Sequence, residues 1–494
     1  MASLKKNFIY QTGYQVLATA LPLITTPYIN RVLGAEQLGT YTYAANIANY
    51  FTIFAMLGFN NYGSKMIAAT KHNENKLAHT FSSIRKLQCL MATVVVAIYL
   101  LFISLCIPEY KSLYFIESLW IINCFIDINW FFWGMEKVKL TVNRNLIIKL
   151  ITLLGVFIFV RSRNDILIYA FILVIGTILS DIYLISQVKK YVKGTKTTLY
   201  EMLAHIKPCM ALFIPIVAMS IYQQMDKTML GLLSTYEQVG YYSSSDKIVN
   251  IPLGIITGLG TVSLPRIVSL ISENKIMEYK KVVEKSISLV MFMCSAIAFG
   301  ILAVSQEFVP LFFGREFLPC VSLVSFLVFV IFFKAISTVL VNQILIPNDN
   351  EKYYITSVFI GAFINLILNY SLIRKFDAIG AVYATLISEL IVCFVQIFVC
   401  FKYLNTLKII GKNFQYIIFG ILMYSLVRKV AILIKDTSLF QRNILEILLG
   451  GTFFLGACVI YWKIKKDSTF YPIITNFLDK LKRKDNGDML RKNK

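Results

Sequence analysis

The sequence predicts an all-α, polytopic membrane protein with about fourteen transmembrane helices. Its composition is the first reason: 57% of the 494 residues are hydrophobic, 15% are charged, and the mean hydropathy is +0.67. These values are typical of a membrane protein and not of a soluble domain. The second reason is a series of long apolar runs separated by short polar turns. The third is an internal repeat that divides most of the chain into two similar halves.

Each predicted helix is a run of about 20 mainly apolar residues, which is the length needed to cross the hydrocarbon core of a bilayer. No loop between the runs exceeds about 20 residues, so no soluble domain fits between them. The basic tail after the last run is expected to be partly disordered. The runs are 8–32, 38–61, 86–107, 112–134, 143–160, 165–188, 206–233, 236–264, 285–305, 317–346, 353–373, 378–401, 412–434 and 443–462.

The first run has some features of a signal peptide. Two lysines precede it, and the Ala-Thr-Ala sequence at 18–20 resembles a cleavage site. However, Gln11 and Gln15 interrupt the apolar stretch, which then continues to Leu33. We therefore expect an uncleaved first helix.

The Lys and Arg residues are divided unequally between the two sides of the predicted membrane. Of the 49, 34 fall on the side of the termini, about 11 on the opposite side and four inside helices. Because basic residues are enriched in cytoplasmic loops, both termini are expected to be cytoplasmic. The same distribution explains the net charge of +22 without a nucleic-acid partner, since a basic inner face lies against anionic lipid head groups.

The nine cysteines and three histidines indicate neither a metal site nor a disulfide framework. Nearly all the cysteines lie inside apolar runs, none forms a CxxC pair, and the histidines make no cluster. We expect the cysteines to be small apolar packing residues. No cofactor is predicted.

An internal repeat relates two segments of the chain. Residues 36–50, EQLGTYTYAANIANY, align without gaps with residues 237–251, EQVGYYSSSDKIVNI, and six of the fifteen positions are identical. A tight turn alone favours Gly and Tyr, but the matching Ile and Asn deeper in each helix favour a duplication. Six predicted helices separate the two segments, so the copies run in the same direction, as two six-helix lobes related by an axis along the membrane normal. The predicted domains are an N-terminal lobe (1–190), a C-terminal lobe (191–405), helices 13 and 14 (406–464) and a basic cytoplasmic tail (465–494).

Two Asp-Lys doublets lie inside the seventh and eighth predicted helices. Asp226 and Lys227 occupy one, and Asp246 and Lys247 the other, each doublet on one helical face with nearby polar residues such as Tyr242. A charge at the centre of a bilayer costs about 2.5–3.5 kcal/mol on insertion scales. These charges are therefore expected to line a water-filled cavity, to pair with one another or to contact a charged substrate.

Four segments, in order along the chain, resemble the polysaccharide flippases of the multidrug/oligosaccharidyl-lipid/polysaccharide (MOP) superfamily, which include Wzx-type O-antigen and capsule repeat-unit translocases. The resemblance covers almost the whole chain, and the helix number and duplication agree with this MATE/MOP-like architecture. The segments are RVLGAEQLGTYTYA (31–44), MDKTMLGLLSTYEQVGYYSSSDKI (225–248), PLFFGREF (310–317) and FDAIGAVYATLISE (376–389).

This resemblance implies a protein of the bacterial plasma (inner) membrane that carries undecaprenyl-diphosphate-linked oligosaccharide to the outer leaflet by alternating access. It also implies a cationic cavity for the diphosphate, to which lysine is suited because it is a compact charge without bidentate geometry. Coupling to a proton gradient, a sodium gradient or the membrane potential is implied as well. So are partnerships with the polysaccharide polymerase and the chain-length machinery.

The candidate residues combine the doublets with other polar groups on predicted helices. Glu389 and Asp127 are candidates for binding a coupling ion, because carboxylates inside membrane helices are functional by default. Lys149 lies close enough to a helix end for its ammonium group to reach the interface. The predicted substrate-binding residues are Lys247, Asp246, Lys227, Asp226, Lys334, Arg31, Asn46, Asn49 and Tyr242.

A flippase for the peptidoglycan precursor and an ion-coupled multidrug exporter of the same superfamily are the alternatives. A cavity for cationic drugs should be acidic or aromatic, whereas this one carries lysines. A membrane glycosyltransferase or polymerase would usually have a large external loop or clustered catalytic residues in loops. Because the chain has no such loop, we expect a transporter and not an enzyme.

Overall fold

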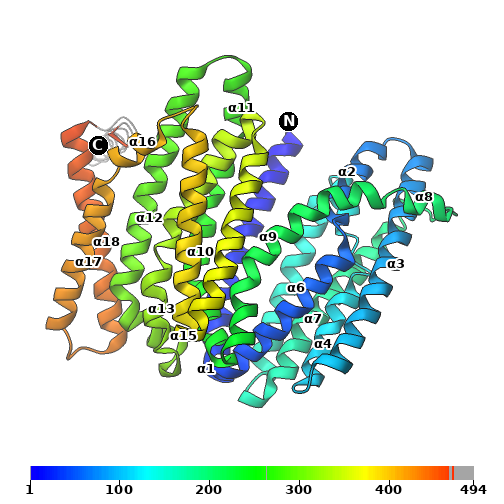
Figure 1. Ribbon diagram of the computed structural model, residues 1–494, viewed down its shortest axis with the longest axis horizontal. Helices are drawn as coiled ribbons and strands as arrows, with labels where there is room; N and C mark the ends of the chain where they lie inside the picture. Colours follow the sequence, from blue (N-terminus) through cyan, green and yellow to red (C-terminus); the bar gives the residue numbers. More distant parts are fainter. Residues whose placement is uncertain (1, 263, 467–469, 472–494) are drawn as a thin grey trace, which may run out of the picture. The chain divides into compact units, whose positions relative to one another are not determined.

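A computed structural model describes residues 2–262, 264–466 and 470–471 (Figure 1). The described residues are mostly helical and include no strand, and all fourteen predicted helices correspond to helical segments. Nine helical stretches of this part of the chain are long and apolar enough to cross a membrane. The helices are α1 (Ala2–Met56), α2 (Phe59–Thr70), α3 (Glu74–Cys106), α4 (Lys111–Asn123), α5 (Asn129–Gly134), α6 (Val138–Phe159), α7 (Ile166–Val188), α8 (Leu199–Leu203), α9 (Ile206–Leu233), α10 (Tyr236–Val262), α11 (Leu264–Ser272), α12 (Ile276–Phe313), α13 (Cys320–Leu327), α14 (Val330–Leu340), α15 (Glu351–Cys400), α16 (Thr406–Lys412), α17 (Gln415–Leu433) and α18 (Leu439–Lys465).

Two of the predicted turns between helices are single-residue breaks. α1 contains the first predicted helix and most of the second, whose last residues (57–61) form a turn and the start of α2, and it is interrupted at Gly34 (φ 75°, ψ 174°). α15 contains the eleventh and twelfth and is interrupted at Asp377 (φ 50°, ψ −131°). Glycine suits the positive φ at position 34, and a Cβ atom there would lie 2.7 Å from the Glu316 carboxylate.

The fourth predicted helix (112–134) is divided into α4 and α5 by the non-helical residues 124–128. The buried Gln88 side chain on α3 closes this break, because its Nε2 donates to the carbonyl oxygens of Cys124 (2.6 Å) and Asp127 (2.7 Å). Backbone groups freed from a helix at membrane depth need such partners. The break therefore depends on a residue far away in the sequence.

The ninth and tenth predicted helices also differ from the structure. The tenth (317–346) is made of α13, α14 and the π-helical residues Val341–Leu345. The ninth (285–305) is the central part of α12, whose 38 residues span about 57 Å at about 1.5 Å per residue, well beyond the about 30 Å of a bilayer core. The added turns of α12 carry polar residues, which a search for apolar runs excludes.

The described chain forms two compact units. Unit 1 contains residues 2–247, 312–323 and 358–385, and unit 2 contains the described residues of 248–311, 324–357 and 386–471. The predicted lobe boundaries at 190 and 405 stay a prediction. The predicted tail (465–494) lies almost entirely outside the described residues.

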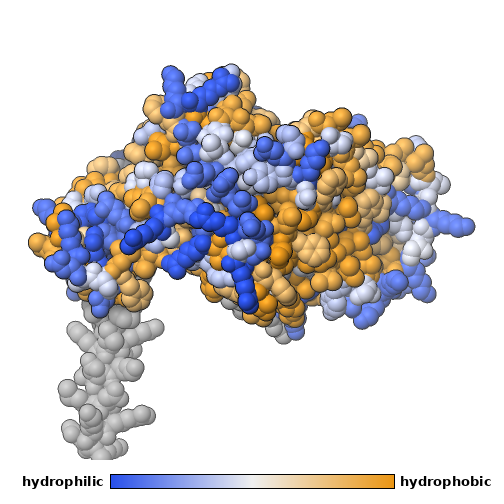
Figure 2. All heavy atoms as spheres, turned by 90° about the horizontal axis from the view of Figure 1, so that it is seen from below, coloured by the Kyte–Doolittle hydropathy of each residue, from blue (hydrophilic) through white to orange (hydrophobic). Residues whose placement is uncertain are grey.

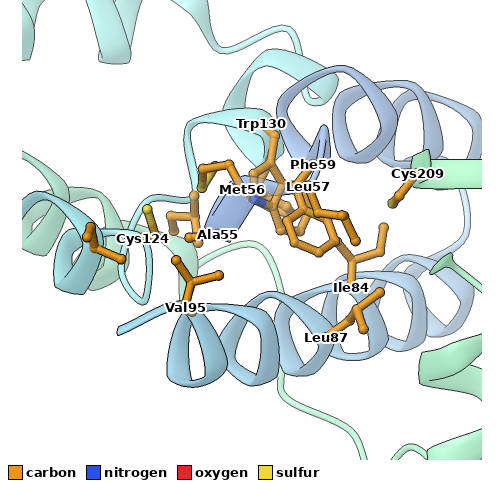
Figure 3. Close-up of a cluster of buried hydrophobic side chains, with 14 of the residues drawn as sticks. Ala55, Met56, Leu57, Phe59, Ile84, Leu87, Val95, Cys124, Trp130 and Cys209 are labelled. Atoms are coloured by element: carbon orange, nitrogen blue, oxygen red, sulfur yellow. The ribbon is translucent and has the colours of Figure 1, made fainter. Parts of the chain in front are cut away.

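The core of unit 1 includes a large cluster of buried apolar side chains (Figure 3). Figure 3 shows Trp130 of α5 beside Phe59 at the start of α2, with α3 side chains below them. A Cβ atom on Gly63 would lie only 2.6 Å from the Trp130 ring, so glycine allows the ring to pack against this helix. Cys124 and Cys209 belong to this cluster, and seven of the nine cysteines are buried, whereas Cys89 is partly buried and Cys106 is exposed.

The two repeat segments cross each other inside unit 1. A Cβ atom on Gly39 would lie 1.6 Å from the Tyr236 carbonyl oxygen, and one on Gly240 would lie 2.0 Å from the Ala35 carbonyl oxygen. In the repeat alignment, Gly39 matches Gly240 and Ala35 matches Tyr236. This reciprocal contact is what a local two-fold axis between two copies produces, so the backbones of α1 and α10 support the duplication.

The core of unit 2 contains a group of aromatic side chains. Phe292 of α12 lies 5.3–5.8 Å, between ring centroids, from Tyr416 of α17 and from Phe454 and Trp462 of α18. Trp462 Nε1 donates a hydrogen bond to Tyr416 Oη at 2.8 Å. These contacts attach the last two long helices to the rest of unit 2.

The surface keeps broad apolar areas, one face of which is seen in Figure 2. On α6, large apolar side chains recur every three or four residues and are 52–58% exposed. Soluble proteins seldom expose such stripes, whereas a bilayer solvates them. The protein is a multi-pass membrane protein. The stripe consists of Ile147, Ile151, Leu154 and Ile158.

Candidate functional site

The two Asp-Lys doublets lie on α9 and α10, which a short turn connects. Lys227 Nζ of α9 lies 2.8 Å from Asp246 Oδ2 of α10, and their side chains are 20% and 22% exposed. The two predicted polar stripes therefore meet, and one charge of each doublet neutralises a charge of the other.

Lys247 is the lysine of the two doublets that does not take part in this ion pair. It is partly buried, and within the described part of the chain it makes no ion pair and no hydrogen bond. Lys227 and Asp246 both lie close enough to act on it electrostatically. A lysine at membrane depth without a dedicated partner can bind an anion and release it again.

Asp226 points into a buried polar cluster and not toward the lysines. Its Oδ2 accepts hydrogen bonds from Tyr242 Oη of α10 (2.6 Å) and Thr385 Oγ1 of α15 (2.7 Å). Its Oδ1 accepts from the amides of Asn369 (2.7 Å) and Asn365 (3.1 Å), both on α15. Four uncharged donors thus stabilise one carboxylate that is 7% exposed.

This cluster could also hold a monovalent cation. Carboxylate, hydroxyl and amide oxygens are ligands that hard cations prefer, and an amide that turns over presents its oxygen in place of its nitrogen. The buried Asn369 Oδ1 has no hydrogen-bond partner among the described residues. A single carboxylate matches one positive charge. The described residues contain no group of three or more His, Cys, Asp and Glu side chains that could hold a metal ion.

The predicted asparagines of the N-terminal half lie on the part of α1 after Gly34. Asn46 and Asn49 are both partly buried, and the buried Nδ2 of Asn46 has no hydrogen-bond partner in the described structure. One residue further on, Tyr50 Oη lies 3.1 Å from Thr228 Oγ1 of α9. This end of α1 therefore lies beside the stretch of α9 that carries Lys227.

Lys334 and Glu389 form a pair within unit 2. Lys334 Nζ of α14 lies 3.5 Å from Glu389 Oε1 of α15. The lysine side chain is 32% exposed, whereas that of the glutamate is 6% exposed. The predicted substrate lysine and the predicted ion-coupling carboxylate thus neutralise each other.

Arg31 lies one turn before the break in α1. Its Cγ would lie 3.3 Å from a Cβ atom on Gly314, a residue of the third motif. Glu316 of that motif accepts a hydrogen bond from the Ala35 backbone N–H (2.9 Å) and pairs with Arg163 (2.5 Å). These contacts all lie within unit 1 and join the first motif to the third.

The second and fourth motifs meet in the same unit. Ser234 Oγ donates to Asp377 Oδ1 (2.6 Å), and the Ala378 backbone N–H donates to Gln238 Oε1 (3.4 Å). The four segments that carry the family resemblance therefore contact one another in pairs around the helix breaks at Gly34 and Asp377.

A charged loop lies beside the first of these breaks. Asp165 accepts hydrogen bonds from the backbone N–H groups of Arg161 (2.8 Å) and Ser162 (2.7 Å). These two bonds stabilise the Asp165 carboxylate. The loop that presents Arg163 to Glu316 is thus fixed by a charged cap.

Asp127 lies at the break between α4 and α5. Its Oδ1 accepts from the backbone N–H (3.0 Å) and the Nδ2 (2.7 Å) of Asn129.

A buried ion pair lies in the same unit. Arg144 Nη1 pairs with Asp181 Oδ1 at 3.0 Å, and both residues are buried. This ion pair holds Arg144 of α6 inside unit 1.

Asn365, Asn369 and Thr385 are polar residues at the Asp226 cluster that the sequence interpretation missed. Asn365 and Asn369 stand four residues apart inside an apolar run, which places both on one helical face. That spacing was a detectable signal. Thr385 had none, because threonine is common in membrane helices and often bonds to its own backbone; here the Ala381 carbonyl oxygen lies 2.9 Å from the same hydroxyl and competes with Asp226 for its proton.

Comparisons with known proteins agree with this fold. The family described as "Polysaccharide biosynthesis protein" matches residues 4–271, and the family described as "Lipid II flippase MurJ" matches residues 146–456. A protein of Escherichia coli named "Putative O-antigen transporter" is 24% identical over 397 residues, which are 79% of this chain and 95% of the relative. A protein of the same name from Shigella dysenteriae is 23% identical over 396 residues, or 79% of this chain and 98% of the relative.

Solved structures show the same architecture. The lipid II flippase MurJ in an inward closed conformation superimposes with a TM-score of 0.73 and 15% identity, over 93% of this chain and 99% of that one. An inward-facing multidrug resistance MATE transporter of the MOP superfamily gives a TM-score of 0.61 and 13% identity, over 79% of this chain and 94% of that one. The chain therefore belongs to the polysaccharide biosynthesis protein family, and it is a transporter of the flippase type and not an enzyme.

Proposed function

We propose that the protein carries undecaprenyl-diphosphate-linked oligosaccharide repeat units from the cytoplasmic to the outer leaflet of a bacterial inner membrane by alternating access. The names of its Escherichia coli and Shigella relatives support an O-antigen or related surface polysaccharide as the end product. The distribution of Lys and Arg supports cytoplasmic termini.

The observation that carries the proposal is the position of Lys247. A diphosphate must lose water to cross the membrane, and a cation at that depth replaces part of its hydration. Lys247 offers an ammonium group without an ion pair of its own, beside the Lys227–Asp246 pair. That pair can open to give a second lysine to the diphosphate, while Asp246 limits the affinity so that the head group can leave.

The Asp226 cluster is the cation site that we propose for coupling. Its carboxylate lies on α9 next to Lys227 and is bonded to both halves of α15 through Asn369 and Thr385. A cation that replaces the hydrogen bonds among these groups would change how α9 and α15 pack. The Asp226 cluster offers a cation several oxygen atoms. The other candidate, Glu389, already has its charge paired with Lys334.

The test uses a deletion strain complemented with variants of the chain. We expect deletion to remove the surface polysaccharide and to leave full-length lipid-linked repeat units in the cytoplasmic leaflet. Wild-type protein should restore export, and Lys247→Ala should reduce it at least tenfold at an unchanged protein level in the membrane. Lys149→Ala is the matched control, because Lys149 is an exposed lysine on another apolar helix, α6.

The second candidate is the peptidoglycan precursor, because the family described as lipid II flippase matches residues 146–456. If that were the substrate, depletion of the protein would stop cell-wall synthesis and lyse the cells, with the precursor held in the inner leaflet. Normal growth of the deletion strain without surface polysaccharide would exclude it. Normal polysaccharide together with normal growth would contradict both candidates.

A further inference from the structure

Glu117 is a buried carboxyl group that the proposed transport site does not use. It lies on α4 and is 0% exposed. Neither of its carboxyl oxygens has a hydrogen-bond partner among the described residues, and it forms no ion pair with them. Asp181 in the same unit is 2% exposed but pairs with Arg144 at 3.0 Å and accepts a hydrogen bond from Asn123 at 2.8 Å. Burial alone therefore does not explain the isolation of Glu117.

The side chains around Glu117 carry no compensating charge. α4 packs against α1, α3 and α7. The titratable groups that face Glu117 from these helices are Tyr41 on α1, Tyr99 on α3 and Tyr169 on α7. On α4 itself, the carbonyl oxygen of Tyr114 accepts the Tyr99 hydroxyl at 3.3 Å. Tyrosine is uncharged at neutral pH, and within the described chain Glu117 forms no ion pair with a cation.

A carboxylate without hydrogen bonds or a counter-ion is unstable in such surroundings, whereas the neutral acid is tolerated. We propose that Glu117 is a proton-binding site, which takes up a proton when α1, α4 and α7 close around it and gives that proton to water when they separate. The O–H bond breaks in the second step, and the carboxylate that remains is stabilised by the water admitted between the helices.

A glutamine or methionine would fill the same space without a need for a proton, and ionisable groups at membrane depth mark functional sites. α1 connects Glu117 to the lysines. It carries Tyr41 beside Glu117 and, further along, Tyr50, whose hydroxyl lies 3.1 Å from Thr228 of α9. A change in the charge of Glu117 thus acts on the helix that lies beside Lys227. This link to transport rests on the proposed function, whereas the binding of the proton does not.

The first experiment measures the proton directly. Infrared spectra of the full-length protein in lipid bilayers at neutral pH should contain a protonated-carboxyl band that Glu117→Gln lacks. The exposed Glu109, eight residues earlier, gives the matched control, because Glu109→Gln should keep the band. Identical spectra for the wild type and Glu117→Gln would overturn the proposal.

A second measurement needs only the wild-type protein, in case Glu117→Gln does not fold. Hydrophobic carbodiimides react with protonated carboxyl groups inside membranes. Peptide mass spectrometry should find the adduct on Glu117 and not on Asp181, in an amount that falls as the pH is raised. Labelling of Asp181 as strong as that of Glu117 would contradict the proposed difference between them.

The third measurement tests the exchange of the proton during transport. In proteoliposomes, an imposed pH gradient should change the rate of repeat-unit flipping several-fold for the wild type and should have no effect on Glu117→Gln. An unchanged response of Glu117→Gln would overturn the exchange. If neither protein moves the repeat unit but the infrared band depends on Glu117, the proposed function fails and the proton site stands.

Discussion

The Lys227–Asp246 ion pair joins α9 to α10 and also neutralises charge beside Lys247. Asp246→Ala would leave two lysines near each other without an anion. Hydrogen bonds to charged groups contribute about 1.5–3 kcal/mol, so we expect a lower melting temperature and a lower amount of protein in the membrane. The exchanged pair, Lys227→Asp with Asp246→Lys, should recover most of the lost stability. An exchanged protein as unstable as Asp246→Ala would show that the pair contributes nothing.

Sodium should stabilise the protein through the Asp226 cluster. A ligand at 100 times its Kd stabilises the folded state by about 2.7 kcal/mol, which raises the melting temperature measurably. We expect this rise for the wild type when sodium chloride replaces choline chloride at constant ionic strength. Asp226→Asn removes the only formal charge of the cluster and should abolish the response. An equal sodium response in this variant would place the ion elsewhere.

The helical spacing of the doublets predicted that charged residues of α9 and α10 would meet, because the doublets lie at most 21 positions apart, on the two sides of one short turn. It could not predict which lysine would be paired. The partners of Asp226 on α15 were beyond this reasoning, since Asn369 stands 143 positions away in the chain. Whether the predicted residues bind substrate stays a prediction.

The crossing of α1 and α10 gives a sharp test of the packing between the two repeats. A methyl group on Gly240 would lie 2.0 Å from the Ala35 carbonyl oxygen, so the two backbones would have to separate. Overpacking of this kind costs about 1–3 kcal/mol, and Gly240→Ala should lower the melting temperature and the amount of folded protein.

Gly254 supplies the control on the same helix. Nothing lies within 4 Å of a Cβ atom there, so Gly254→Ala should be neutral or should stabilise the helix by up to about 1 kcal/mol. Equal effects of the two substitutions would mean that α1 and α10 do not touch at Gly240.

The existence and order of the helices could be predicted because a bilayer demands long apolar runs. Their breaks could not. Gln88 makes the gap between α4 and α5 possible from another helix, and the single-residue break at Asp377 depends on contacts with Ser234. The full length of α12 was missed for a different reason, because polar residues at 278–284 and 306–307 interrupt the apolar pattern although the helix continues through them.

Beyond the repeat, α17 and α18 are attached to α12 by a charged network within unit 2. Glu307 of α12 is 2% exposed, pairs with Arg428 at 2.7 Å and also contacts Arg442, which in turn lies 3.4 Å from Glu446. Together with the aromatic group around Phe292, this network accounts for how two helices outside the duplication become part of a compact unit. The sequence predicted both helices but gave no sign of the ion pairs, since each charge lies near the end of an apolar run.

Replacing both arginines, as Arg428→Gln with Arg442→Gln, would leave two buried carboxylates without counter-ions. Removing one partner of a buried ion pair costs about 3–5 kcal/mol, which is a large part of the about 5–15 kcal/mol that keeps a typical protein folded. We therefore expect the amount of protein in the membrane to fall several-fold. Adding Glu307→Gln and Glu446→Gln should restore most of it, because a neutral, hydrogen-bonded cluster avoids the cost of desolvating charge. Membrane protein levels and melting temperatures of the two variants decide the matter. If the fourfold variant is no better than the double one, the arginines hold α17 and α18 by packing alone and not by charge.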